Sequence, residues 1–325
     1  MSRKLLLMLS MVILVGSIFI RPTEGKEYPS KPIEIYCPYA AGSSMDITAR
    51  VIADVAPKYL GQPMVVIDKA GASGSLCAAE VIRSNPDGYK LAILANLFFA
   101  STVYTQKITF DPKDLIPIAN FMEYKLGIAV KADSPWKTLG DILDFGKKNP
   151  GKLRWAHAGR GTSLFTYTLL IFRKAGIEAV DVPYPGSPQQ TAALMGGHVD
   201  ISAAPYGAQK GAVQGGRIRF VVMFTDKRFD DPSDVPSATE LGYPEAAKLP
   251  TVVGLYAHKD TPVEIQKKLF GAFKKTYEDP EFKKGLGKLG EQPRFGGPEF
   301  MKEAIKNAEE VSVPILKESG LYVGK

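Results

Sequence analysis

Short apolar runs alternate with helical patterns along this chain, beginning at residue 33. Three of these runs have the length and composition of buried strands: IEIYC (33–37), MVVID (64–68) and KLAILAN (90–96). Between the first two, Ile47, Val51 and Val55 recur every four residues, which places them on one face of a helix. The order strand, helix, strand, helix, strand predicts an α/β fold with a parallel sheet.

The same alternation recurs after residue 126. Further strands are expected at LRWAHA (153–158), AVDVPY (179–184) and VDISAA (199–204), with helices over 163–174 and 189–195. A chain of 325 residues with 45% apolar side chains is too large for one ordinary core. The sequence therefore predicts two α/β lobes.

The N-terminal segment has the pattern of a secretory signal peptide. Arg3 and Lys4 precede an apolar run from Leu5 to Ile20, and Gly25 follows as a small residue at a cleavage site. An uncleaved membrane anchor is the alternative, but this 16-residue run is shorter than the about 20 residues that a span needs. We expect residues 1–25 to be removed near Gly25 and the mature protein to be soluble and exported.

The charge of the mature chain is mildly basic. Four charged residues in 1–25 contribute +2 of the formal net charge of +7, which leaves +5 on the mature chain. An excess of positive charge of this size, spread along the chain, assists the binding of anionic ligands but does not indicate nucleic-acid binding.

The cysteines are Cys37 and Cys77. An oxidising compartment would permit a disulfide between them, while their apolar surroundings favour two buried thiols, and the sequence leaves both open.

Small residues follow three of the expected strands, where a helix should begin: PYAAGSS (38–44), GASGS (71–75) and GRGTS (159–163). A helix N-terminus leaves N–H groups without partners and carries a partial positive charge, so small residues there let an anion reach the backbone. In open α/β sheets, ligands bind outside the carboxyl ends of the strands. Each loop alone reads as an ordinary cap or turn, but together they predict a cleft for an acidic ligand.

Catalytic and metal-binding motifs are missing from the sequence. GASGS lacks the spacing of a nucleophile elbow, and GRGTSL does not match a dinucleotide-binding loop. His157, His198 and His258 are dispersed, without the spacing of metal ligands. We therefore expect binding rather than catalysis, with no cofactor and no metal. Asp46 is expected to fix its loop, since its charge would repel a carboxylate.

Longer motifs carry a resemblance to a known family. They occur in the order YPSKPIEIYCPYAAGSSMD, GQPMVVIDKAGASGSLCAAEVIRSNPDGY, VPYPGSPQQTAALMGGHVD, PSATELGYPE and AHKDTPVEIQKKL. The chain resembles, over nearly all of its mature length, the substrate-binding proteins of tripartite tricarboxylate transporters, often called Bug proteins. It departs from the family pattern at Ser43, where the first loop usually has a second glycine, and at Ser73, where the second loop usually reads G-A-G-G.

The resemblance implies a two-lobed periplasmic binding protein of the type II kind. Each lobe would be a mostly parallel sheet flanked by helices, with two crossing strands as a hinge. Lobe 1 would comprise residues 26–127 and 254–325, and lobe 2 residues 128–253. Such a protein would be a periplasmic monomer that binds a small carboxylate in the cleft, with a di- or tricarboxylate or an aromatic acid as the candidates, and delivers it to the membrane subunits of the transporter. A ligand sensor for a signalling partner, or an exported enzyme on the same scaffold, are the alternatives.

The expected ligand-binding residues lie on the small loops and on the wall that faces them. In lobe 1 they are Tyr39, Ala40, Ala41, Gly42, Ser43, Ser44, Gly71, Ala72, Ser73, Gly74, Ser75 and Asn96, and in lobe 2 they are Arg160, Gly161, Thr162, Ser163, Tyr184 and Pro185. The guanidinium of Arg160 suits a second carboxylate, which predicts a diacid; a solvent-facing arginine is the alternative. Phe98, Phe99 and Phe165 near the loops would suit an aromatic acid.

Overall fold

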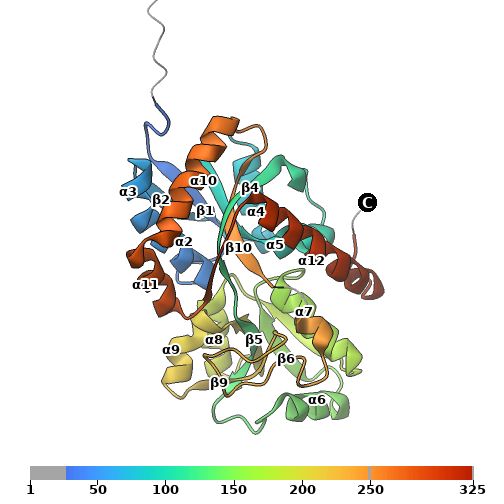
Figure 1. Cartoon of the computed structure of the whole chain (residues 1–325). Coiled ribbons are helices and arrows are strands. Elements are labelled where there is room, and N and C mark those ends of the chain that lie inside the picture. Colours follow the sequence, from blue (N-terminus) through green and yellow to red (C-terminus); the bar gives the residue numbers. More distant parts are fainter. Residues whose placement is uncertain (1–26, 248–249, 324–325) are drawn as a thin grey trace, which may run out of the picture.

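The computed structural model describes residues 27–247 and 250–323, which form two lobes that each contain one sheet (Figure 1). The predicted signal peptide lies outside the described residues. The first sheet has the strand order β11-β4-β10-β3-β1-β2, and the second has the order β7-β6-β8-β5-β9. The strands of the first sheet are β1 (Ile33–Cys37), β2 (Met64–Asp68), β3 (Lys90–Ala95), β4 (Leu115–Glu123), β10 (Val252–His258) and β11 (Gln292–Gly296). Those of the second are β5 (Leu126–Lys131), β6 (Leu153–His157), β7 (Ala179–Pro183), β8 (Ile201–Pro205) and β9 (Ile218–Met223).

Helices cover both sheets (Figure 1). Around the first sheet lie α2 (Ser44–Val55), α3 (Pro57–Leu60), α4 (Ser75–Ile82), α5 (Asn96–Ala100), α10 (Val263–Glu278), α11 (Pro280–Leu289) and α12 (Pro298–Glu318). Around the second lie α6 (Leu139–Lys148), α7 (Ser163–Lys174), α8 (Ser187–Met195) and α9 (Tyr206–Gln214). The two-lobed α/β architecture predicted from the sequence is confirmed.

Both sheets are mixed rather than mostly parallel. Strand β1 runs parallel to β2 and β3, and β6 runs parallel to β7 and β8, as the strand–helix alternation predicts. Strand β10 is antiparallel to β3 and β4, and β5 is antiparallel to β8 and β9. The antiparallel pairs arise where the chain crosses between the lobes, because β4, β5 and β10 adjoin the crossings. The predicted lobe boundaries fall within β5 and β10.

Separate cores lie under the two sheets. In the first lobe, Phe121 packs against Phe273 and Phe282, with ring centroids 5.7 Å apart in both pairs. In the second, Trp155 packs against Phe165 and Phe172 at 5.4 and 5.8 Å. Cys37 and Cys77 are buried free thiols in the first lobe. Each lobe therefore has its own apolar interior. Because these aromatic clusters each lie within one lobe, the space between the lobes can serve as a ligand site.

Helix α12 connects the two lobes along one side (Figure 1). It packs against α5 of the first lobe and α7 of the second. At its end, Arg173 of α7 donates to the carbonyl oxygens of Glu318 and Ser319, both over 2.9 Å. Contacts of α12 therefore link the two lobes in addition to the two chain crossings.

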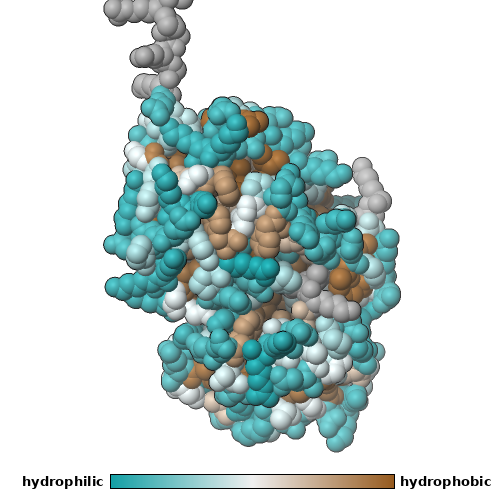
Figure 2. Space-filling model, viewed as in Figure 1, coloured by the Kyte–Doolittle hydropathy of each residue, from teal (hydrophilic) through white to brown (hydrophobic). Residues whose placement is uncertain are grey.

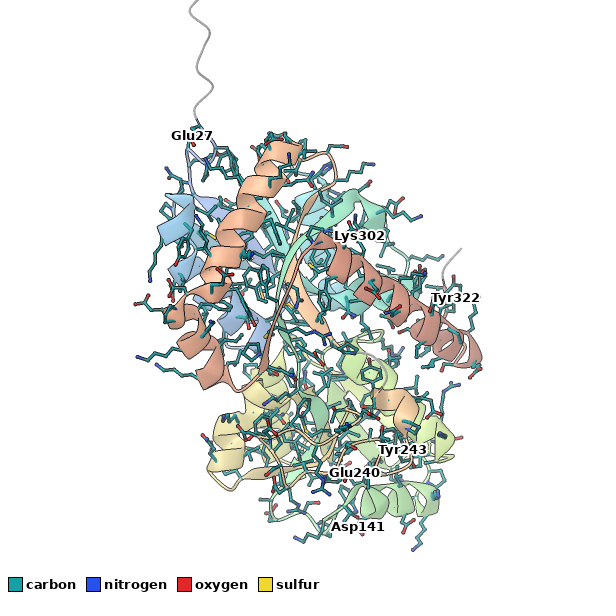
Figure 3. All side chains as sticks on the ribbon, in the orientation of Figure 1. Glu27, Asp141, Glu240, Tyr243, Lys302 and Tyr322 are labelled. Carbon is teal, nitrogen blue, oxygen red and sulfur yellow. The ribbon has the colours of Figure 1, made fainter. Side chains whose placement is uncertain are left out.

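The outer surface is largely hydrophilic on the face drawn in Figure 2. Side chains such as Glu27, Asp141, Glu240 and Lys302 lie on the outside of the lobes (Figure 3). Among the described residues, every helix is too short or too polar to cross a membrane.

Candidate ligand-binding site

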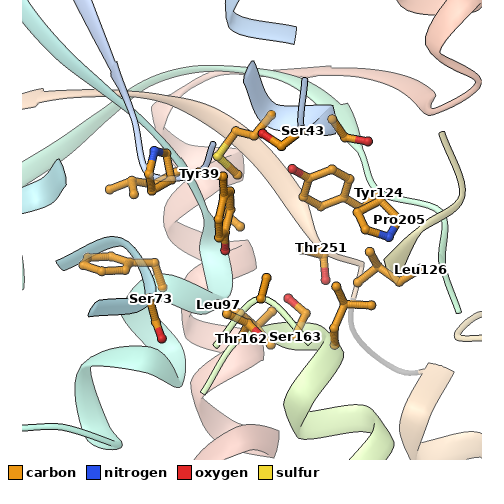
Figure 4. Close-up of a pocket in the computed structure, with 18 of the residues that line it drawn as sticks. Tyr39, Ser43, Ser73, Leu97, Tyr124, Leu126, Thr162, Ser163, Pro205 and Thr251 are labelled. Atoms are coloured by element: carbon orange, nitrogen blue, oxygen red, sulfur yellow. The ribbon is translucent and has the colours of Figure 1, made fainter. Parts of the chain in front are cut away.

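A narrow pocket lies between the lobes (Figure 4). Its cavity volume is about 50 Å³, and it adjoins a wider mouth of about 510 Å³. Four residues belong to both spaces: Pro38, Tyr39, Ser73 and Ala158. The two lobes are closed on each other around it.

Helix α2 begins at the wall of the pocket. Ser43 caps the helix with extended backbone (φ −69°, ψ 157°), and its hydroxyl accepts the N–H of Asp46 over 3.2 Å. Ser44 and Met45 follow in the first turn and line the pocket. First-turn N–H groups have no acceptor within their own helix, so this wall offers backbone donors at the positive end of a helix.

Helix α7 repeats this arrangement on the opposite wall. Thr162 caps it with nearly the same backbone (φ −69°, ψ 160°), and its hydroxyl accepts the N–H of Phe165. Ser163 and Leu164 line the pocket from the first turn. Figure 4 shows Ser43 across the pocket from Thr162 and Ser163. Two helix N-termini, one from each lobe, therefore converge on one cavity.

The remaining walls are apolar or aromatic. They are formed by Pro38, Tyr39, Leu94, Ala95, Leu97, Phe98, Tyr124, Leu126 and Pro205, with the hydroxyls of Ser73, Thr102, Ser187 and Thr251 between them. Burial raises the pKa of Tyr39 and of Tyr124, so both phenols are neutral and able to donate near neutral pH. Among the described residues, none of the side chains lining this pocket carries a charge.

Direct contacts between the lobes surround the pocket. The N–H of Ala40 donates to the carbonyl oxygen of Pro185 over 3.2 Å, and the hydroxyl of Thr102 donates to the carbonyl oxygen of Gly161 over 3.1 Å. Gly159 lies against Ser73, and a Cβ added at Gly159 would meet the Ser73 hydroxyl oxygen at 2.2 Å. Any larger residue at position 159 would therefore have to displace Ser73 in the closed form and adopt a strained φ of +127°.

The structure brings part of the predicted site together. The pocket is lined by Tyr39, Ser43, Ser44, Ser73, Thr162 and Ser163, and the mouth by Gly71, Ala72, Arg160, Tyr184 and Pro185. The other predicted residues line neither space: Ala40, Ala41, Gly42, Gly74, Ser75, Asn96 and Gly161. Of the three phenylalanines, Phe98 lines the pocket, whereas Phe99 packs on Tyr256 and Phe165 on Trp155.

Several of the residues outside the pocket have structural partners instead. The amide nitrogen of Asn96 donates to the carbonyl oxygens of Pro250 and Ala304, and its oxygen accepts from the N–H of Val252. Asp46 accepts the N–H of Gly42 over 2.8 Å and pairs with Arg50. The prediction that Asp46 fixes its loop is confirmed.

Arg160 lies at the mouth and is already paired. Its Nε and Nη2 donate to the two carboxylate oxygens of Asp181, each over 2.9 Å. Asp181 also contacts Nε2 of His157 at 3.1 Å, and these partners hold its pKa well below the usual range. A second ligand carboxylate at Arg160 would compete with Asp181, so the diacid contact at this residue stays a prediction.

The sequence reasoning missed residues that come from the crossings between the lobes. Tyr124 and Leu126 lie at the first crossing and Thr251 at the second, and all three line the pocket. No loop motif marks them. Their signal is topological, because any chain segment that crosses between two lobes passes the base of the cleft.

Glu291 is a buried acid directly behind the pocket wall. Its Oε1 accepts from the Ser44 hydroxyl over 3.0 Å and from the N–H of Gly207 over 3.1 Å, and its Oε2 accepts from the N–H of Lys125 over 2.8 Å. Burial raises the pKa of Glu291 to about 7, against the opposing effect of these hydrogen bonds. Its carboxyl group therefore changes charge near neutral pH.

Metal coordination finds no support in the described part of the chain, where no group of three or more His, Cys, Asp or Glu side chains is placed to hold an ion.

Comparison with known proteins places this architecture in a family. The family model for "Tripartite tricarboxylate transporter family receptor", TctC, matches residues 48–321. A protein of Cupriavidus necator, described as "UPF0065 protein in gbd 5'region", is 36% identical over 293 residues, covering 89% of this chain and 88% of that protein. A solved structure described as "Structure of a periplasmic transporter" is 32% identical, with a TM-score of 0.84, and covers 91% of this chain and all of the other.

A second solved structure carries a ligand. MatC (Rpa3494) from Rhodopseudomonas palustris, with bound malate, is 27% identical to this chain, with a TM-score of 0.80, covering 88% of this chain and 100% of MatC. The resemblance found in the sequence motifs is confirmed. The chain belongs to the tripartite tricarboxylate transporter receptor family, whose members are periplasmic solute-binding proteins.

Proposed function

We propose that this protein is an exported receptor that closes on a small carboxylate with an apolar carbon skeleton and delivers it to the membrane subunits of a tripartite tricarboxylate-type transporter. One observation carries the proposal. The first turns of α2 and α7, one from each lobe, line the same pocket, and no charged side chain among the described residues lines it. An anion there would be held by backbone N–H groups and hydroxyls.

The two helix ends suit two carboxylate groups. One carboxylate would accept from the N–H groups of Ser44 and Met45, and the other from those of Ser163 and Leu164. The lobes would close once both ends are engaged, because each helix belongs to a different lobe. The malate bound to the related MatC supports a dicarboxylate.

The walls between the helix ends favour a skeleton with few hydroxyl groups. Leu97, Phe98 and Leu126 offer contact surface but no hydrogen bonds. A ligand hydroxyl placed against these three side chains would lose its water without gaining a partner, which costs free energy, whereas one placed beside the hydroxyls of Ser73, Thr102, Ser187 or Thr251 would be paired. We therefore infer that a dicarboxylate such as adipate, whose carbon chain lies on the apolar side chains, binds more tightly than one whose hydroxyl meets them.

Calorimetry with matched pairs of ligands tests this function. Adipate and hexanoate have the same number of carbons and differ by one carboxylate, and succinate and malate differ by one hydroxyl. We expect adipate to bind more tightly than hexanoate, and succinate more tightly than malate. Failure of all four ligands to bind would contradict the carboxylate receptor.

The partner is tested separately in cells. Deletion of the gene should abolish uptake of the ligand that calorimetry identifies, and expression of the full chain should restore it. Uptake that is unchanged by the deletion, with loss of a transcriptional response to the same ligand, would instead identify a sensor.

A further inference from the structure

Glu291 connects the ligand pocket to the base of both lobes. Only 3% of its surface is exposed, and its three donors come from α2 (Ser44), from the first crossing (Lys125) and from the start of α9 (Gly207). A Cβ added at Gly207 would meet Oε1 of Glu291 at 2.6 Å, so the second lobe packs directly on this carboxyl group. Ser44 is the member of this group that also lines the pocket.

The Ser44 hydroxyl has one proton to donate. While Glu291 is ionised, that proton is held by Oε1, and Ser44 presents only lone pairs to the pocket. A carboxylate ligand also has only lone pairs to offer. The ionised form of Glu291 therefore withholds a donor from the ligand and places a second negative charge behind the anion site.

A proton on Glu291 reverses this hydrogen bond. Protonated Oε1 would donate to the Ser44 hydroxyl oxygen, and the Ser44 proton would become available to the ligand. Oε2 would continue to accept from the N–H of Lys125, while the N–H of Gly207 would have only the remaining lone pair of the protonated Oε1 as its acceptor. The proton comes from solvent and is released again when the ligand leaves.

We propose that Glu291 is a positioning residue that acts through Ser44: a proton on its carboxyl group turns the Ser44 hydroxyl toward the ligand, so that binding of a carboxylate takes up one proton. This inference rests on the proposed carboxylate site. It makes the receptor a device that holds its ligand more tightly in an acidic compartment and releases it more readily as the surroundings become alkaline.

The charged groups near Glu291 are mostly paired with other residues, so Glu291 is the group whose charge changes with pH. The elements packed around it carry Asp46 on α2, Tyr124 and Lys125 at the first crossing, Lys210 on α9, Lys288 on α11 and Arg294 on β11. Asp46 pairs with Arg50, Lys210 with Asp231, and Arg294 with Glu123. Among the described residues, no lysine or arginine forms an ion pair with Glu291 itself. Its pKa, raised by burial to about 7, places the change near neutral pH.

The test is calorimetry of adipate binding at pH values between about 5.5 and 8.5, in buffers of different ionisation enthalpy. We expect affinity to fall about tenfold from pH 6 to pH 8, with uptake of about half a proton at pH 7 that approaches one proton at pH 8, since one linked proton changes affinity by up to tenfold per pH unit. Glu291→Gln, which mimics the protonated acid, should bind adipate at pH 8 as tightly as the wild type does at pH 6, without proton uptake. A pH dependence that persists in Glu291→Gln would overturn the proposal.

Two further variants test the coupling through Ser44 and control for the loss of a buried acid elsewhere. Ser44→Ala removes the hydroxyl while keeping its N–H, and should lose most of the pH dependence; a full pH dependence in this variant would overturn the route through Ser44. Asp279→Asn is the matched control, because Asp279 is a buried acid that caps the other end of α11 and contacts no pocket residue. Its pKa is lowered, so it stays ionised over this range, and its profile should match the wild type.

A ligand-free measurement keeps this inference distinct from the proposed function. Infrared spectra of the free protein should show a protonated-carboxyl band that titrates near neutral pH and is missing in Glu291→Gln. If none of the four ligands binds at any pH, the carboxylate receptor fails, and the infrared titration still reports on Glu291. A band that is unchanged in Glu291→Gln would overturn the proposal whether or not adipate binds.

Discussion

The backbone N–H of Ala40 in the first lobe donates to the carbonyl oxygen of Pro185 in the second, over 3.2 Å. Both residues lie in loops at the edge of the pocket, so this hydrogen bond forms only when the lobes are closed. It belongs to the same closed surface as the contact of Gly159 with Ser73. Closure is therefore made by backbone groups that meet at short range, with little room for added side chains.

Gly159→Ala should prevent this closure. The new Cβ would meet the Ser73 hydroxyl oxygen at 2.2 Å, and Gly159 has φ +127°, which alanine adopts only with strain. We expect ligand affinity to fall by at least about tenfold. X-ray scattering in the presence of ligand should give a larger radius of gyration for the variant than for the wild type. Gly176→Ala is the control, since its φ is +68° but nothing lies within 4 Å of the added Cβ. Equal affinity losses in the two variants would contradict a steric block to closure.

Ser163→Pro tests the backbone donors directly. Proline is tolerated at the first position of a helix, where it removes the N–H together with the serine hydroxyl, and the extended backbone of Thr162 (φ −69°, ψ 160°) is compatible with a following proline. A hydrogen bond to a charged group contributes about 1.5–3 kcal/mol, so affinity should fall by roughly one to two powers of ten. Calorimetry would measure this, with circular dichroism to check that the helix persists.

Ser163→Ala is the matched variant for that experiment. It removes the hydroxyl and keeps the N–H, so we expect a smaller loss than in Ser163→Pro. An equal or larger loss in Ser163→Ala would show that the side chain, not the backbone, holds the ligand.

Arg160→Ala separates a direct contact from an electrostatic effect. If Arg160 binds a second carboxylate, the variant should weaken adipate by about one to two powers of ten and leave hexanoate unchanged. An electrostatic effect is the other explanation, because the variant leaves the Asp181 carboxylate at the mouth with His157 but without its arginine partner. Arg160→Ala combined with Asp181→Asn removes both charges. Full recovery of adipate affinity in the double variant would exclude a direct contact by Arg160.

The stability of the free protein should depend on pH through Glu291. Burial raises the pKa of this group from 4.5 to about 7, so between these values the folded protein holds a proton that the unfolded chain has released. The stabilisation is complete below about pH 4.5 and is lost as the pH rises through about 7. We expect the free energy of unfolding of the wild type, relative to Glu291→Gln, to fall by about 3 kcal/mol over this range. Urea unfolding at several pH values would measure it, and a difference that does not change with pH would contradict the raised pKa.

Local patterns in the sequence were sufficient to predict the two-lobed architecture and the N-termini of α2 and α7. The apolar runs at 33–37 and 64–68 coincide with β1 and β2, and the small loops before Ser44 and Ser163 are the starts of α2 and α7. These features are local, since strand length, helix spacing and capping residues are set by neighbours in the chain. The antiparallel course of β10 is not local, because it depends on where the chain returns from the second lobe.

The parts of the site that escaped prediction depend on contacts between distant residues. The pairing of Arg160 with Asp181 joins a loop to the neighbouring strand β7. Asn96 became a structural residue because Pro250 and Ala304 approach its amide. Glu291 sits more than 240 positions from Ser44, and nothing in its own stretch, LGEQPRF, marks it. Composition and residue spacing give no information on which residues that are distant in the sequence come into contact.

The absence of a charged side chain from the described pocket wall has a consequence for how such receptors diversify. Main-chain donors cannot be deleted by ordinary substitution, since every residue except proline supplies the same N–H. With the proposed binding mode, the hydrogen bonds to the carboxylate would therefore survive most substitutions, while Leu97, Phe98 and Leu126 in the walls could vary. Single substitutions in a lineage with this pocket would then change the carbon skeleton that it accepts without removing the donors that hold the carboxylate.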